Sequence, residues 1–154
     1  MIRIFTDGAA QGNPGPGGYG TILKYNKHVK ELSQGYRLTT NNRMELMAVI
    51  VGLEAIHKEG ISITIYSDSK YVVDSVEKGW IWSWQKKNFT KKKNADLWQR
   101  YIPLHLKLKP KFVWIKGHAG HAENERCDQL AVQAAEDNNL LTDKWYEANK
   151  DADP

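Results

Sequence analysis

Two aspartates stand directly after stretches whose residues favour β-strands. Asp7 follows the apolar run Ile2–Thr6, and Asp68 follows Ile61–Ser67, in which isoleucines alternate with polar residues. In open α/β sheets, ligands bind outside the carboxyl ends of the strands, so both carboxylates are expected at one edge of a sheet. Carboxylate oxygens are hard ligands that suit Mg²⁺ or Mn²⁺. Metal-dependent chemistry is therefore the first hypothesis for this chain.

Each acid, taken alone, also has a structural explanation. Asp7 with Gly8 can form a turn, and Asp68 can cap the helix that follows it. Glu45 stands three residues after Asn42, which is the spacing of a capping box. For any one of them alone, the structural role is the better explanation. A catalytic role needs the acids to act together.

The elements that must position these acids can be read from hydrophobic periodicity and turn residues. The expected strands are Ile2–Thr6, Tyr19–Tyr25, Val29–Tyr36, Ile61–Ser67 and Lys111–Lys116. The expected helices are Asn42–Lys58, Lys70–Lys78, a segment around Ala95–Arg100 and Asn124–Glu136. Pro103 should end or kink the third helix. Residues 80–93 break the periodic pattern, and 117–123 is expected to be a flexible loop.

Three strands followed by alternating helices and strands predict an α/β fold. The sheet should be five-stranded and mixed, with three antiparallel strands, two parallel strands and helices flanking it. The length of 154 residues fits one domain. We expect the domain to span residues 1–138. Residues 139–154 are expected to form a C-terminal tail that has no clear periodicity and can be disordered.

The charge distribution favours a polyanionic partner. The net charge is +4, and residues 143–154 hold four acids against two lysines, which leaves +6 for residues 1–142. A basic body attracts polyanions but does not choose between DNA, RNA and an anionic membrane. No apolar stretch approaches the roughly 20 residues of a membrane span. A single cysteine, Cys127, excludes an intrachain disulfide, so a cytoplasmic protein without a membrane partner is expected.

Five short motifs, in this order along the chain, resemble those of the bacterial type 1 ribonucleases H. The motifs are Ile4–Gly8 (IFTDG), Asn41–Leu46 (NNRMEL), Tyr66–Ser69 (YSDS), Lys116–His121 (KGHAGH) and Asn124–Asp128 (NERCD). The resemblance covers about residues 2–136, and several motifs must coincide to produce it. It implies a ribonuclease H-like fold. It also implies an endonuclease that hydrolyses the RNA strand of RNA–DNA hybrids by a two-metal-ion mechanism, leaving 3′-hydroxyl and 5′-phosphate ends.

The resemblance also assigns the catalytic residues. The family's metal-binding acids fall on Asp7, Glu45, Asp68 and Asp128, and its mobile-loop histidine falls on His118. The implied cofactor is Mg²⁺, with Mn²⁺ as a possible substitute. Two such cations roughly 3.5–4 Å apart stabilise charge on the attacking and leaving oxygens of a phosphodiester. Without metal, the clustered acids should repel one another and raise at least one pKa. His118 would transfer a proton or assist product release.

The remaining assignments concern substrate binding, and each has a structural alternative. The matching positions are Asn13, Asn41 and Asn42 for the RNA 2′-hydroxyl, Thr40 and Asn94 for a DNA phosphate, and Trp80 and Trp84 for the DNA strand. Asparagines in loops are commonly turn and cap residues. The tryptophans, interleaved with lysines, suit either a nucleic-acid groove or a Trp-anchored helix beside a solvated lysine loop.

Three rival hypotheses are compatible with parts of the sequence. A zinc site at His118, His121 and Cys127 is disfavoured, because structural zinc usually takes four nitrogen or sulfur ligands and no cysteine pair is present. A DNA-strand nuclease or integrase of related fold is disfavoured by the tryptophan-lysine segment and the KGHAGH motif. A non-catalytic hybrid-binding module gains nothing from four clustered acids. The expected partner is thus an RNA–DNA hybrid, bound by a monomer.

Overall fold

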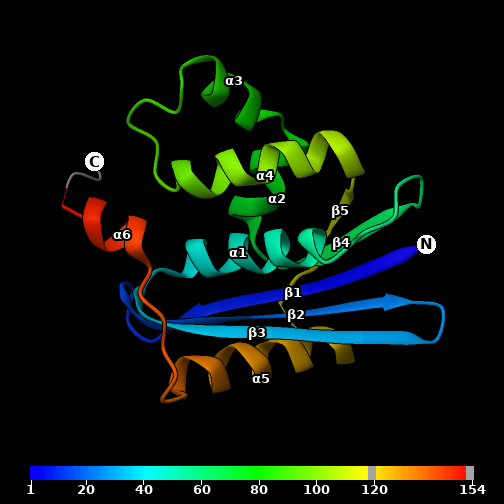
Figure 1. Ribbon diagram of the computed structural model, residues 1–154, viewed down its shortest axis with the longest axis horizontal. Coiled ribbons are helices and arrows are strands. Elements are labelled where there is room, and N and C mark those ends of the chain that lie inside the picture. Colours follow the sequence, from blue (N-terminus) through cyan, green and yellow to red (C-terminus); the bar gives the residue numbers. More distant parts are fainter. Residues whose placement is uncertain (118–120, 152–154) are drawn as a thin grey trace.

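A five-stranded mixed sheet forms the centre of the computed structural model, which describes residues 1–117 and 121–151 (Figure 1). The strands are β1 (Ile2–Ala10), β2 (Gly15–Tyr25), β3 (His28–Thr39), β4 (Ile63–Ser67) and β5 (Lys111–Trp114). Their order is β3-β2-β1-β4-β5. The pairs β1–β2 and β2–β3 are antiparallel, whereas β1–β4 and β4–β5 are parallel. The predicted α/β class and mixed sheet are confirmed.

Helices cover both faces of the sheet. The helices are α1 (Asn41–Glu54), α2 (Lys70–Glu77), α3 (Trp80–Lys86), α4 (Ala95–Leu108), α5 (Ala122–Glu136) and α6 (Lys144–Asn149). Helix α1 packs on β1 and β2 from one face, with α4 on its outer side, and α5 packs on β1, β2 and β3 from the other (Figure 1). Among the described helices, none is long and apolar enough to cross a membrane.

Helix α1 lies between the sheet and α4, so it is buried almost all round. Its residues from Arg43 to Ile50 are all buried, which an amphipathic surface helix would not show. In the sheet below, Ile4 and Ile65 are completely buried beside it. This buried packing fixes the orientation of α1 and therefore the direction in which the side chain of Glu45 points.

Helix α5 approaches the sheet closely because glycines face it. A Cβ atom at Gly20 would lie 2.3 Å from the carbonyl oxygen of Cys127, and one at Gly35 would lie 2.0 Å from that of Ala134. Any side chain at these positions would push the helix outward. The close packing brings Asp128, one residue after Cys127, towards β1.

Several element boundaries differ from the sequence predictions, and helix α1, for example, ends at Glu54 and not at Lys58. Strand β1 does not stop at Asp7, because Asp7–Ala10 continues to pair with Gly17–Gly20 of β2. Residues 80–86 form α3. Helix α4 continues past Pro103 to Leu108. The ring of Pro103 is exposed, while Tyr101, Ile102 and Leu108 pack into the core, so burial sustains the helix beyond the proline.

The chain after residue 138 is also more regular than its periodicity indicated. Leu141 bridges to Tyr36, and its backbone exchanges hydrogen bonds with Gly35 (3.0 Å) and Arg37 (2.9 Å). Helix α6 follows and lies beside β3. The segment 139–151 is therefore attached to the sheet, although its sequence shows no clear helical pattern.

Candidate active site

Four elements bring the acids to one edge of the sheet. Asp7 lies within β1, two residues beyond the last pair that β1 makes with β4, and Asp68 directly follows β4. Glu45 belongs to α1, and Asp128 belongs to α5 on the opposite face. Asp7 is thus near the end of the parallel pairing rather than at the end of its own strand.

Three of the acids form a tight group. A carboxylate oxygen from each of Asp7, Glu45 and Asp68 lies within 4.8 Å of the others. Asp7 and Glu45 are buried, and Asp68 is half-buried. The N–H of Gly8 donates to Oδ1 of Asp7 at 3.0 Å and also to Oε1 of Glu45. One main-chain donor therefore orients two of the three acids.

Gly8 makes this geometry possible. A Cβ atom at residue 8 would lie 2.3 Å from the carbonyl carbon of Met44 and 2.4 Å from the nitrogen of Glu45. Since real Cβ atoms do not approach backbone so closely, a glycine is required for β1 and α1 to meet here. Their contact is what brings Glu45 to Asp7.

Asp128 faces the same cleft as the three acids. The cleft has a volume of about 420 Å³, and its wall includes Asp128 together with Asp7, Glu45 and Asp68. Asp128 is half-buried and lies outside the tight group. The structure therefore brings all four predicted acids to one cleft, with three close together and the fourth at its wall.

The electrostatics of the group favour a bound cation. Burial raises the pKa of Glu45 well above its ordinary value, and the charges of Asp7 and Asp68 raise it further. A divalent cation would offset both effects by compensating the negative charge. Buried, converging carboxylate oxygens are also the donor set that Mg²⁺ and Mn²⁺ prefer, so these residues fit such a metal.

Replacing Glu45 should stabilise the metal-free protein at neutral and alkaline pH. Because the pKa of Glu45 is raised on folding, its contribution to the free energy of unfolding falls as pH rises from the unfolded value of 4.5 through the folded one. Glu45→Gln removes this loss. In EDTA, its thermal midpoint should exceed that of the wild type by a few degrees at about pH 8 and by less at about pH 5. An equal gain in Glu59→Gln, an exposed acid outside the cleft, would contradict this explanation.

The structural alternatives for these acids do not hold. Ser69 caps α2 by accepting from the N–H of Val72 at 3.2 Å, so Asp68 is not the cap. Thr40 is the N-cap of α1, because its side chain accepts a hydrogen bond from the N–H of Arg43 at 3.2 Å. Glu45 is therefore not part of a capping box with Asn42 as its N-cap residue. Asp7 lies inside a strand and not in a turn.

A second, polar pocket adjoins the cleft. It measures about 270 Å³ and contains Thr40, Asn94 and Asn13, three of the predicted substrate contacts. Asn42 lines both the pocket and the acidic cleft, and Asn41 lines the cleft. The predicted contacts to DNA phosphate and to the 2′-hydroxyl therefore form one continuous surface beside the acids.

The loop asparagines also have local structural roles. Oδ1 of Asn13 accepts from the N–H of Asn41 at 3.1 Å, and Oδ1 of Asn41 accepts from the N–H of Ala10 at 2.6 Å. These bonds join the loop after β1 to the start of α1. A role in recognising the 2′-hydroxyl stays a prediction alongside this structural role.

The two tryptophans that were predicted to contact the DNA strand lie on α3, where they form an aromatic surface together with neighbouring lysines. Trp80 is 43% exposed, and its ring centroid lies 6.5 Å from that of Trp84. The ammonium of Lys78 lies 5.5 Å from the centre of the Trp80 ring, and that of Lys92 lies 5.1 Å from the centre of the Trp84 ring. Trp84 also packs edge-on against the buried Trp98. The segment therefore anchors α3 in the fold and exposes aromatic and cationic groups together.

His118 lies outside the described residues. Of the other proposed zinc ligands, Cys127 is buried, and its Sγ lies 3.2 Å from the carbonyl oxygen of Phe5, to which it donates. Burial raises the pKa of this thiol well above its ordinary value. Cys127 is thus a small packed residue of α5 and not a ready metal ligand.

Sequence reasoning did not identify Lys70 or Lys150 as site residues, whereas Lys93 belongs to the segment of tryptophans and lysines that was considered for nucleic-acid binding. Lys70 lines the acidic cleft, and Lys93 and Lys150 line the polar pocket. Lys70 follows Asp68 by two residues, so its position was a usable signal. Lys150 had no such signal, because nothing in the sequence places the C-terminal segment beside the site.

Comparisons with known proteins agree with this geometry. The sequence profile of the RNase H family matches residues 1–136. Ribonuclease H of Rippkaea orientalis is 52% identical over 151 residues, covering 95% of this chain and 92% of its own. Ribonuclease HI of Shewanella oneidensis is 52% identical over 153 residues, covering 96% of each chain.

Solved structures extend the likeness to the fold. LC9-RNase H1, a type 1 RNase H with the type 2 active-site motif, superposes with a TM-score of 0.77 at 28% identity, covering 96% of this chain and 80% of its own. LC11-RNase H1, crystallised with an RNA/DNA hybrid, gives a TM-score of 0.68 at 25% identity, covering 88% and 97%. With the acidic cleft and the family match over residues 1–136, these likenesses show that the chain belongs to the ribonuclease H family.

Proposed function

We propose that this ribonuclease H is an endonuclease that hydrolyses the RNA strand of RNA–DNA hybrids by a two-metal-ion mechanism, leaving 3′-hydroxyl and 5′-phosphate ends. The observation that carries the proposal is the group of three carboxylates within 4.8 Å of one another in an open polar cleft. Support comes from the related LC11-RNase H1, which was crystallised with an RNA/DNA hybrid.

The acids would hold the metal ions, with Asp7, Glu45 and Asp68 at the centre and Asp128 at the wall of the cleft. We assign Mg²⁺ as the cofactor, with Mn²⁺ as a substitute. When bound, such cations stabilise charge on the attacking and leaving oxygens of the phosphodiester. The N–H of Gly8 keeps the carboxylates of Asp7 and Glu45 oriented towards each other. His118 would transfer a proton or assist product release.

The surfaces beside the cleft would hold the two strands. In this arrangement the RNA strand lies over the acids. Asn13, Asn41 and Asn42, which line the cleft or the adjoining pocket, would sense the 2′-hydroxyl that distinguishes RNA from DNA. The DNA strand places a phosphate in the pocket of Thr40 and Asn94. It then continues towards Trp80 and Trp84, whose rings offer stacking surfaces among lysines.

We further propose that the protein acts as a cytoplasmic monomer. All the surfaces assigned to substrate come from one chain, so no second copy is needed to complete the site. The free, buried thiol of Cys127 suits a reducing compartment.

Substrate choice and metal removal test the function directly. A labelled RNA–DNA hybrid, the same RNA as a single strand and the same duplex as DNA are incubated with Mg²⁺ and with EDTA. We expect rapid cutting of RNA in the hybrid with Mg²⁺, and loss of that cutting in EDTA. Cleavage of the DNA duplex, or hybrid cleavage that persists in EDTA, would overturn the proposal.

A further inference from the structure

The polar pocket beside the acids is completed by the C-terminal segment. Its wall consists of Asn13, Pro14, Thr40, Asn42, Lys93, Asn94, Tyr146 and Lys150. Two of these residues come from the segment 139–151, and the charged side chains among the described residues of the wall are the two lysines. The described residues of the wall offer amide and hydroxyl groups and two ammonium groups but no carboxylate, and such a set of groups is suited to an anion.

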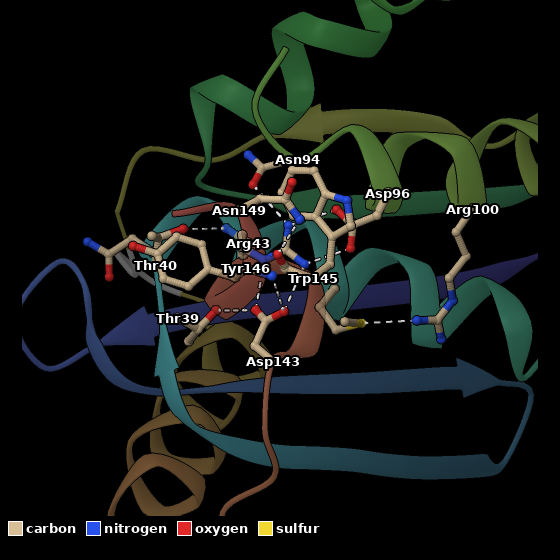
Figure 2. A network of polar contacts seen from close by, with 12 residues as sticks. Thr39, Thr40, Arg43, Asn94, Asp96, Arg100, Asp143, Trp145, Tyr146 and Asn149 are labelled. Carbon is tan, nitrogen blue, oxygen red and sulfur yellow. Dashed lines mark hydrogen bonds and ion pairs between the residues drawn. The ribbon is translucent and has the colours of Figure 1, made fainter. Parts of the chain in front are cut away.

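A buried guanidinium holds the C-terminal segment in place (Figure 2). Arg43 of α1 is 1% exposed. Its Nε and Nη2 donate to the carboxylate of Asp143 at 2.7 and 3.0 Å, and the hydroxyl of Thr39 donates to the same carboxylate at 2.8 Å. Asp143 also accepts from the N–H of Tyr146 at 3.4 Å, which caps α6. The start of α6 is thus bonded to the start of α1.

The same guanidinium binds the opposite wall of the pocket. Nη1 and Nη2 of Arg43 donate to Asp96 at 2.9 and 2.8 Å, and Nη1 lies 3.3 Å from Oδ1 of Asn94. The ring of Trp145 covers the guanidinium, with its centroid 5.0 Å away. Burial lowers the pKa of Arg43, but the hydrogen bonds that it donates to Asp96 and Asp143 outweigh this effect and raise the pKa above its ordinary value. Arg43 is therefore a permanent cation that fixes α6 and residue 94 relative to each other.

A second attachment lies on the outside of α6. Arg37 of β3 donates to both carboxylate oxygens of Glu147 at 2.9 and 2.8 Å. Together with Arg43, this contact fixes both the start and the middle of the short helix. Lys150, the next residue after α6, lies at the pocket and is exposed to solvent.

We infer that the C-terminal segment 139–151 is part of the substrate-binding site, and that Lys150 with Lys93 neutralises a backbone phosphate of the bound hybrid in this pocket. The inference rests on the proposed function for the identity of the polyanion. Thr40 and Asn94 supply the polar contacts, whereas the lysines supply the charge. Each lysine that meets a phosphate releases condensed counterions, which makes binding depend on salt.

Two charge-matched variants test this inference. Lys150→Gln is compared with Lys144→Gln, which removes the same charge from the first residue of the same helix but not from the pocket. For Lys150→Gln we expect a KM for hybrid that rises several-fold with little change in kcat. We also expect the slope of log binding constant against log salt concentration, measured in EDTA, to fall by about 0.7–0.9. Lys144→Gln should leave both near the wild-type values.

The outcomes separate this inference from the proposed function. If the wild type does not cut the hybrid, the proposed function fails before the variants are compared. If the wild type cuts and the two variants share one salt slope and one KM, the role of Lys150 is wrong and the proposed function stands. Lys150→Glu should weaken binding more than Lys150→Gln. Because Lys150 is exposed, unchanged thermal midpoints should accompany these effects.

Discussion

Asp7→Asn should lower the rate of hybrid cleavage by at least about a thousandfold, which corresponds to roughly 4 kcal/mol of lost transition-state stabilisation. Asp7 is buried and contributes to the group of three carboxylates within 4.8 Å. Asparagine has nearly the same shape but no negative charge, so the site should lose its affinity for a divalent cation. Single-turnover cleavage with Mg²⁺ measures the rate, and hybrid binding measured in EDTA should be largely unchanged.

The matched control is Asp74→Asn, the same substitution at an ion-paired residue of α2 outside the cleft. It should cut at a rate close to that of the wild type. Asp7→Asn should not unfold the protein, because it removes one of the charges that raise the pKa of Glu45. A near wild-type rate for Asp7→Asn, with Mg²⁺ still raising the thermal midpoint, would show that the metal binds elsewhere.

The sheet could be predicted because its strands carry local patterns. In β4, apolar Ile63 and Ile65 alternate with polar residues because one face of the strand is buried, and this alternation is visible in the sequence itself. The end of β1 could not be found this way. Residues 7–10 are strand because Gly17–Gly20 of β2 pair with them, and a glycine-rich partner has no hydrophobic period to reveal it.

Helices were missed where tertiary contacts outweigh local preference. Pro103 argues against a helix, yet the buried Tyr101 and Leu108 keep α4 intact on both sides of it. Helix α6 has six residues, too few to show a period or to be stable alone. It exists because Asp143 is bonded to Arg43, a residue 100 positions earlier in the chain.

The site was predictable in unequal parts. Asp68 could be placed by its position at the end of a strand, and its neighbour Ser69 proved to be the helix cap. Glu45 could be placed only through the family resemblance, because its approach to Asp7 depends on the contact between Gly8 and α1. Only some of the residues that line the polar pocket were predicted from the sequence. Thr40 and Asn94 were assigned through the family resemblance, whereas Lys150 is held beside the pocket by the Arg43 network.

Asp143→Ala should be the most destabilising single substitution in the C-terminal segment, with a loss of about 3 kcal/mol in the free energy of unfolding. Removing one partner of a buried ion pair typically costs about 3–5 kcal/mol, since it leaves a charge without compensation. Arg43 keeps Asp96, which places the expected loss near the lower end. The cap of α6 is lost as well. Urea unfolding followed by circular dichroism measures the change.

Glu147→Ala is the matched control, because it breaks the other ion pair of the same segment. Arg37 is 61% exposed, and exposed pairs contribute little to stability, so the urea midpoint should scarcely move. The two variants also differ in function. Loss of Asp143 frees α6 from the wall that holds Asn94, so it should raise the KM for hybrid as Lys150→Gln does, even where the variant is fully folded. If Asp143→Ala and Glu147→Ala lowered stability equally and left KM unchanged, Arg43 would be a core residue with no bearing on the pocket. A rise in KM confined to Asp143→Ala would show instead that the buried guanidinium couples the C-terminal segment to substrate binding.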